Sequence, residues 1–111
     1  MAKRLSKALR GKRRWLGVLV SPNIKSKSQM ISNIEKLSQK LELSSSPKLM
    51  DFSVNQLTDG CGTGILQVKL ADSFVIREHL EADDSLEKNG LSSLTTSGKI
   101  RLVRERLSNL D

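Results

Sequence analysis

Apolar residues in the first part of this chain follow the spacing of a strand and then that of a helix. Residues 13–21 form a short apolar run rich in β-forming side chains, which Pro22 ends. Because the run is apolar on both faces, it predicts a central strand. Apolar positions then recur every three or four residues to about Leu43, which predicts a helix with Ser26 or Ser28 as its N-terminal cap.

The middle of the chain alternates between apolar and polar residues in two stretches. In residues 48–57 single polar side chains separate the apolar ones, and residues 65–70 repeat this alternation. The glycine-rich segment 59–64 lies between them. We therefore expect two half-buried strands that a turn joins into an antiparallel hairpin.

The last third of the chain predicts two further helices and one strand. A helix capped by Asp72 or Ser73 is expected to end before the polar stretch 84–90, which predicts a loop or a partial helical turn. Residues 91–96 are a weaker strand candidate. Apolar residues recur at helical spacing over residues 100–110, which predicts a final helix.

The order strand, helix, strand, strand, helix, strand, helix is typical of one fold class. It predicts an α+β protein with a ferredoxin-like antiparallel sheet, similar to the RNA-recognition motif (RRM-like), with helices on one face and a basic C-terminal helix. A chain of 111 residues is expected to form one domain. We assign residues 13–111 to this domain and residues 1–12 to a flexible basic N-terminal arm.

The charge of the chain indicates a class of partner. Lysine and arginine outnumber aspartate and glutamate by 19 to 12, and the formal net charge of +7 favours polyanions such as RNA. Bases gather in residues 1–14 and 99–106, and acids in residues 72–87. The apolar runs fall far short of the ~18 residues that a membrane span needs. One cysteine, Cys61, cannot form an internal disulfide, so we expect a cytoplasmic protein without membrane contact.

RNA binding by this chain is expected to differ from that of a typical RRM, which stacks bases on aromatic side chains of its strands. The chain has three aromatic residues, and the stretch from Gly64 to Leu70 contains none. We therefore expect the two basic ends to contact the phosphate backbone. The candidate RNA-binding residues are Lys3, Arg4, Lys7, Arg10, Lys12, Arg13, Arg14, Ser97, Gly98, Lys99, Arg101 and Arg104.

The sheet face opposite the first two helices is a second candidate surface. Apolar side chains on that face would leave an exposed strip on a small monomer. We expect the last helix to cover part of the strip with Ile100, Val103 and Leu107, and a protein partner to contact the rest. The candidate protein-interface residues are Trp15, Leu19, Ile65 and Gln67.

The sequence predicts neither a catalytic residue nor a metal or cofactor site in this chain. His79 is the only histidine. The chain therefore has no second histidine around which a metal cluster or a Ser–His or Cys–His catalytic pair could be built. Cys61 lies in a glycine-rich turn with no histidine nearby in the sequence. A small enzyme of the acylphosphatase type would need an asparagine and an arginine phosphate cradle. Asn23 and Asn55 are present, but no suitable arginine-bearing loop accompanies the first strand.

Three short motifs give the chain a family resemblance. The motifs are Arg14-Trp15-Leu16 at the first strand, Gly64-Ile65-Leu66-Gln67-Val68 in the third, and Thr96-Ser97-Gly98-Lys99-Ile100 before the last helix. In this order and spacing they resemble the small Pop-type protein subunit of archaeal and eukaryotic ribonuclease P, called protein component two in archaea. The resemblance covers residues 13 to 108. Two positions depart from the family pattern, because Gln67 stands where arginine is usual and Lys99 where threonine is usual.

The resemblance implies a noncatalytic subunit that binds and stabilises the catalytic RNA of ribonuclease P, which removes the 5′ leader from precursor tRNA. The implied partners are the ribonuclease P RNA, a barrel-like protein subunit, and a second copy of this chain as a homodimer within a heterotetramer. The Mg²⁺ ions of the reaction would lie on the RNA and not on this chain. The alternative interpretation is a protein-interaction or scaffold module of another ribonucleoprotein.

Overall fold

The fold of the described residues is a single four-stranded sheet with helices on both of its faces. The computed structural model describes residues 13–43, 46–54, 57 and 59–110. The strands are β1 (Arg13–Val20), β2 (Lys48–Ser53), β3 (Gly62–Lys69) and β4 (Leu91–Ser97). The helices of this part of the chain are α2 (Lys27–Lys40), α3 (Leu70–Leu80), α4 (Ser85–Asn89) and α5 (Ile100–Ser108).

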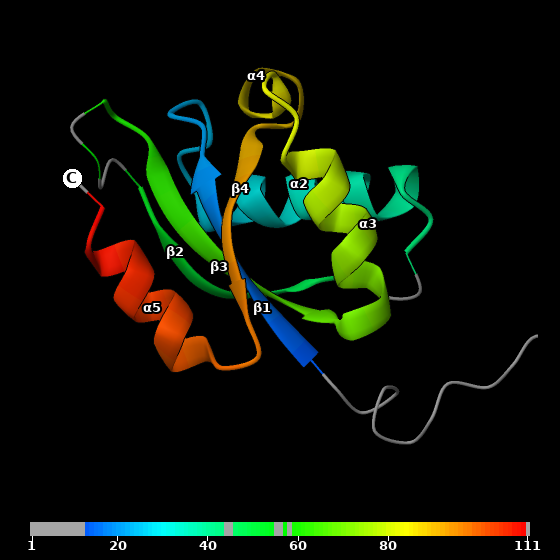
Figure 1. Ribbon diagram of the computed structural model, residues 1–111. Coiled ribbons are helices and arrows are strands. Elements are labelled where there is room, and N and C mark those ends of the chain that lie inside the picture. The colour runs from blue at the N-terminus through cyan, green and yellow to red at the C-terminus, as the bar shows by residue number, and fades with distance from the viewer. Residues whose placement is uncertain (1–12, 44–45, 55–56, 58, 111) are drawn as a thin grey trace, which may run out of the picture.

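The sheet has the strand order β2-β3-β1-β4, and every neighbouring pair is antiparallel (Figure 1). Each strand is followed by the element that the alternation of spacings predicts, so the α+β class is confirmed. The arrangement is compatible with a ferredoxin-like fold. The central strands are β3 and β1, in agreement with the two-sided apolar pattern of residues 13–21.

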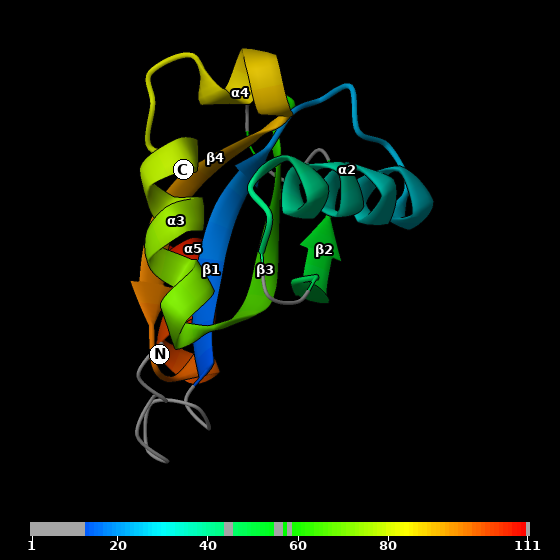
Figure 2. The same cartoon turned by 90° about the vertical axis from the view of Figure 1, so that its right-hand side faces the viewer.

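Two layers of helices enclose the sheet: α2 and α3 lie on one face and α5 on the other (Figures 1 and 2). The larger core lies between the sheet and the α2 and α3 layer. Its buried members are Leu16, Val18, Val20, Met30, Ile34, Leu37, Leu66, Val68, Ile76, Leu80 and Leu91. The smaller core lies under α5 and consists of Ile65, Val103 and Leu107, with Trp15, Ile100 and Leu110 packed against it. The expectation that the last helix covers part of the second face is therefore confirmed.

Close contact between α5 and the sheet depends on Gly17 of β1. A Cβ atom at Gly17 would lie 2.9 Å from Thr95 Cγ2 and 2.9 Å from Val103 Cγ1. Both distances are shorter than real Cβ contacts, so the missing side chain makes room for the helix. A glycine within an apolar strand is typical of such close approach.

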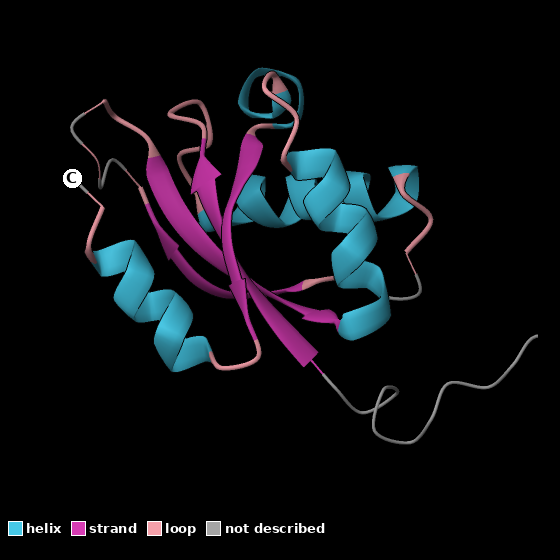
Figure 3. Ribbon diagram, in the orientation of Figure 1, coloured by secondary structure: helices cyan, strands magenta, loops and turns pink. Residues whose placement is uncertain are grey.

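The two edge strands of the sheet in Figure 3, β2 and β4, each carry a bulge, which the register of their pairing shows. In β4 the residue Leu94 is extra, because Gly17 pairs with Thr95 and Val18 with Ser93. In β2 the residue Met50 is extra, between Leu49 and Asp51. A bulge reverses the face of the residues that follow it. The predicted alternation of residues 48–57 is therefore broken, and Asp51 lies on the α5 side of the sheet.

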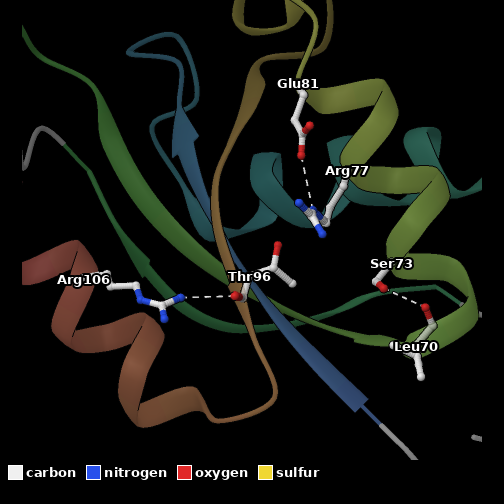
Figure 4. A network of polar contacts seen from close by, with 6 residues as sticks. All are labelled: Leu70, Ser73, Arg77, Glu81, Thr96 and Arg106. Carbon is white, nitrogen blue, oxygen red and sulfur yellow. Dashed lines mark hydrogen bonds and ion pairs between the residues drawn. The ribbon is translucent and has the colours of Figure 1, made fainter.

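The start of α3 differs from the prediction. The helix begins at Leu70, directly after β3, and Lys69 occupies the N-cap without a side-chain hydrogen bond. Asp72 and Ser73 are buried within the first turns, and Ser73 Oγ donates to the carbonyl of Leu70 at 2.6 Å (Figure 4). The expected cap by Asp72 or Ser73 is wrong because the strand passes into the helix without a loop.

The other helix boundaries agree with the sequence pattern more closely. Ser26 caps α2, because its Oγ accepts a hydrogen bond from the backbone N–H of Gln29 at 3.2 Å. The helix ends at Lys40, slightly before the expected end near Leu43. The polar stretch 84–90, for which a loop or a partial helical turn was predicted, contains the short helix α4.

Candidate nucleic-acid interface

Antiparallel pairing brings basic residues from distant parts of the sequence to one end of the sheet. The start of β1, the start of β2, the end of β3 and the end of β4 all lie there. Arg13 of β1 is directly opposite Lys69 of β3, and Lys48 of β2 is opposite Gln67 of β3. We call this the sheet-end basic surface, and its members are Arg13, Arg14, Lys48, Lys69, Lys99 and Arg101.

The bases of the sheet-end basic surface are accessible to a ligand. All are exposed except Arg14, which is half-buried. Within the described part of the chain, the side chains of Arg13, Lys48, Lys69 and Arg101 form neither an ion pair nor a hydrogen bond. Asp72, the acid that follows Lys69 most closely in the sequence, is buried.

The pair Arg13 and Lys69 places two positive charges directly across from each other on neighbouring strands. Like charges in this position destabilise a sheet. A bound anion between the two side chains would reverse the sign of that interaction. The pairing therefore favours anion binding at this position.

The N-terminal and C-terminal basic segments meet at the turn before α5. A Cβ atom at Gly98 would lie 2.8 Å from Nη1 of Arg14, so the arginine lies against the glycine backbone. Arg14 Nη1 also donates to the carbonyl of Arg13 at 3.3 Å. Two of the sequence-predicted segments are thus brought together by the pairing of Trp15 with Ser97.

The start of α5 adds positive potential to the same place. The backbone N–H of Lys99 donates to Ser97 Oγ at 3.1 Å, while Lys99 as N-cap provides no side-chain hydrogen bond to the helix. No acidic residue lies in the first turn of α5, and Arg101 lies within that turn. Because a helix N-terminus carries partial positive charge, cations there leave it uncompensated and favour an anion.

Arg104, a predicted RNA-binding residue, contacts another part of the protein. Its Nε donates to Asp51 Oδ2 at 2.8 Å and its Nη2 to Asp51 Oδ1 at 3.3 Å. This hydrogen-bonded carboxylate raises the pKa of the Arg104 guanidinium. Arg106 donates from Nη1 to Thr95 Oγ1 at 2.8 Å and to the carbonyl of Thr96 at 3.1 Å (Figure 4). The two arginines join α5 to opposite edge strands of the sheet.

Five predicted RNA-binding residues lie outside the described residues, namely Lys3, Arg4, Lys7, Arg10 and Lys12. The chain containing them continues into β1 at Arg13. They are therefore covalently attached to the sheet-end basic surface.

The predicted protein-interface residues have different surroundings. Ile65 is 1% exposed beneath α5, so a partner cannot reach it while the helix is in place. Trp15, Leu19 and Gln67 are half-buried, and Trp15 is directly opposite Gln67. The indole Nε1 of Trp15 is buried and has no hydrogen-bond partner among the described residues. Buried donors are usually paired, so this one is a notable exception.

The residues with reactive side chains are held in structural roles. Cys61 is buried, and burial together with Asp59 raises the pKa of its thiol, so the nucleophilic thiolate is disfavoured. His79 Nε2 lies 3.1 Å from Asn89 Oδ1 at the half-buried rim of α3. Within the residues that the structure describes, no three histidine, cysteine or acidic side chains are grouped as metal ligands. The same residues include no helix long and apolar enough to cross a membrane.

Lys48 and Lys69 belong to the surface but were not predicted from the sequence. Each is the single base of its strand, so a search for charge clusters passes over both. The register of β3 against its two neighbours is the information that places them beside Gln67 and Arg13.

Comparison with known proteins gives no relative: no family model, no curated protein and no solved structure matches this chain.

Proposed function

We propose that this protein is a noncatalytic RNA-binding subunit of a ribonucleoprotein, that its fold is ferredoxin-like, and that the particle is ribonuclease P. The observation that carries the RNA-binding role is the sheet-end basic surface. Bases from four separate segments converge there, and among the described residues none of the exposed ones forms an ion pair. Such a surface is suited to the evenly spaced negative charges of a nucleic-acid backbone.

The positions of the aromatic residues favour binding to phosphate over stacking on bases. Trp15 is packed against the core beneath α5, and Phe52 is packed against the larger core. Phe74 is exposed, but it lies on α3 and not on the sheet. The sheet face that an RRM uses is covered by α5, so stacking on it would require this helix to leave.

The choice of ribonuclease P is supported by the three motifs of the sequence and by where they lie. Trp15 of the first motif is directly opposite Gln67 of the second and Ser97 of the third. The three motifs therefore form one row across β3, β1 and β4. Gln67 lacks the usual arginine charge, and Lys48 directly opposite it supplies a base at the neighbouring position.

In this role the chain binds and stabilises the catalytic RNA, while the RNA and its Mg²⁺ ions remove the 5′ leader from precursor tRNA. The further partners of the proposal are a barrel-like protein subunit and a second copy of the chain in a heterotetramer. The half-buried residues Trp15, Leu19 and Gln67 remain candidates for the protein contact.

The test is a charge-neutral variant of the surface, Arg13→Gln with Lys69→Gln, in a binding assay with a hairpin RNA. Because hydrogen bonds to charged groups contribute about 1.5–3 kcal/mol each, affinity should fall by at least about tenfold. The slope of log K against log salt should become shallower by about 1.5, since each lost phosphate contact removes about 0.7–0.9. The matched control is Lys27→Gln with Arg77→Gln, which removes two exposed charges elsewhere.

Equal RNA affinity of the surface variant and the control variant would show that this surface does not bind RNA. The particle itself is tested by purifying the tagged full chain from its native cells and sequencing the RNA that accompanies it. Ribonuclease P RNA is expected. A different structured RNA would keep the RNA-binding role and reject ribonuclease P, and the absence of RNA would reject both.

A protein-interaction module of another ribonucleoprotein is the second candidate function. It is favoured by exposed apolar side chains outside the sheet-end basic surface: Phe74 is 61% exposed and Val75 43% exposed on α3, and Leu94 on the edge strand β4 is 40% exposed. This candidate predicts that the surface variant binds RNA as the parent does, while the chain still forms a complex with a protein partner through these apolar side chains.

A further inference from the structure

A second basic site lies at the other end of the sheet, between α2, α4 and the loop that follows β1. Two adjoining hollows of about 170 and 400 Å³ share Asn33 and Lys36 as lining residues. We call them together the α2–α4 groove. Its lining contains the lysines Lys36, Lys40 and Lys88 and no aspartate or glutamate. The remaining lining is mostly amide and hydroxyl side chains, which donate hydrogen bonds.

A chain of hydrogen bonds fixes the floor of the α2–α4 groove. Asn33 Nδ2 donates to the carbonyl of Asn89 at 2.6 Å, which joins α2 to the end of α4. Asn89 Nδ2 donates to Ser85 Oγ at 3.1 Å, and Ser85 Oγ donates to the carbonyl of Leu91 at 2.6 Å. Asn89 Oδ1 therefore accepts from His79 Nε2–H at 3.1 Å. These hydrogen bonds hold α2 and α4, the two helices that bear the lysines, in fixed positions relative to each other.

The lysines of the groove are available to a ligand. Lys36 and Lys40 are one helical turn apart on α2, so their side chains project from the same face. Both are exposed, and among the described residues neither forms an ion pair. Lys88 pairs with Asp84 at 2.9 Å, with 72% of the lysine side chain exposed. Such an exposed pair is weak, and Lys88 can turn toward a bound anion at little cost.

We propose that the α2–α4 groove binds a phosphate group of an RNA backbone, as a second contact separate from the sheet-end basic surface. This inference rests on the proposed RNA-binding function. Lys36 and Lys40 compensate the phosphate charge, and the amide of Asn33 lies at the base of the groove between them and Asn89. The eight residues of β1 separate the two ends of the sheet by about 25 Å at 3.3 Å per residue. One RNA therefore contacts the protein at two distant places.

The test compares the variant Lys36→Gln with Lys40→Gln against the Lys27→Gln with Arg77→Gln control, both titrated with the same hairpin RNA. The groove variant should bind about tenfold more weakly, with a salt slope shallower by about 0.7–0.9, because the contact with one phosphate is lost. The control should bind as the parent does. In the parent protein, RNA should also shift the NMR signals of the Asn33 and Asn89 side-chain amides.

The possible outcomes separate this inference from the proposed function. If the parent binds RNA but the groove variant matches the control and both amide signals stay in place, the groove is not a phosphate site and the proposed function stands. If the parent binds no RNA, both are overturned. Weaker RNA binding by the groove variant without any shift of the two amides would also overturn the site, because the effect would then come from general charge.

Discussion

Arg101 and Arg104 are both basic residues of the last helix, and the sequence predicts the same role for each. They differ in the structure because Arg104 pairs with an acidic residue. They are three residues apart on α5 and share a face of the helix. The bulge in β2 turns Asp51 toward α5, and Asp51 forms two hydrogen bonds with Arg104. Arg101, one turn nearer the sheet-end basic surface, has no such partner among the described residues. Of these two arginines, Arg101 is therefore the one that is free to contact a phosphate.

This difference predicts unequal effects of the two single substitutions on RNA binding. Arg101→Gln should weaken RNA binding about tenfold, because a charged hydrogen bond of about 1.5–3 kcal/mol is lost. Arg104→Gln should leave affinity within about twofold and lower the free energy of unfolding by a few tenths of a kcal/mol, as exposed ion pairs do. Filter binding and urea denaturation measure the two effects. If Arg104→Gln weakens RNA binding as much as Arg101→Gln, the ion pair with Asp51 does not prevent Arg104 from contacting RNA.

Individual residues also show what the sequence is able to predict about the surface. The basic runs at both ends of the chain are visible in the sequence and account for Arg13, Arg14, Lys99 and Arg101. The pairing of Arg104 with Asp51 joins residues 53 positions apart and depends on a bulge. No local pattern carries that information, because a single extra residue in an edge strand reverses which side chains face α5.

At the scale of elements, α5 is the feature that most distinguishes this sheet from an RNA-binding sheet of the RRM type. Val103 and Leu107 are buried against Ile65, and Gly17 makes room for them. Arg104 and Arg106 add polar contacts to β2 and β4 on either side. The helical spacing of apolar residues predicted the helix and its buried face. It did not predict the start of α3, because no turn residue marks the passage from β3.

The docking of α5 predicts a large effect of Val103→Ala. Removing two buried methyl groups should lower the free energy of unfolding by about 2 kcal/mol. The exposed Glu105→Ala on the same helix is the matched control and should stay within about 0.5 kcal/mol. Trp15 is the only tryptophan and packs beneath α5, so its fluorescence reports the transition. Equal stability of the two variants would show that α5 is not held by this small core.

At the scale of the whole molecule, positive charge is divided between the two ends of the sheet. The sheet-end basic surface lies where β1 begins, and the α2–α4 groove lies where β1 ends and β4 begins. The sequence shows the first as a basic run but gives no sign of the second. Lys36, Lys40 and Lys88 are spread over two helices of mixed charge, and the hydrogen bond from Asn33 of α2 to Asn89 of α4 holds these helices side by side.

Because the sheet-end basic surface and the α2–α4 groove are separate contacts, substitutions in the two are expected to affect RNA affinity independently. Sites more than about 7–10 Å apart, with no shared partner, usually have additive effects to within about 0.5 kcal/mol. The variant that combines Arg13→Gln, Lys69→Gln, Lys36→Gln and Lys40→Gln should therefore bind about one hundredfold more weakly than the parent. Isothermal titration of the parent, the two double variants and the quadruple variant with one hairpin RNA measures this. A quadruple variant no weaker than the weaker double variant would mean that the two surfaces do not contribute independently to RNA affinity. If the fold-losses in affinity of the two double variants multiply in the quadruple variant, one RNA contacts the protein at both ends of β1.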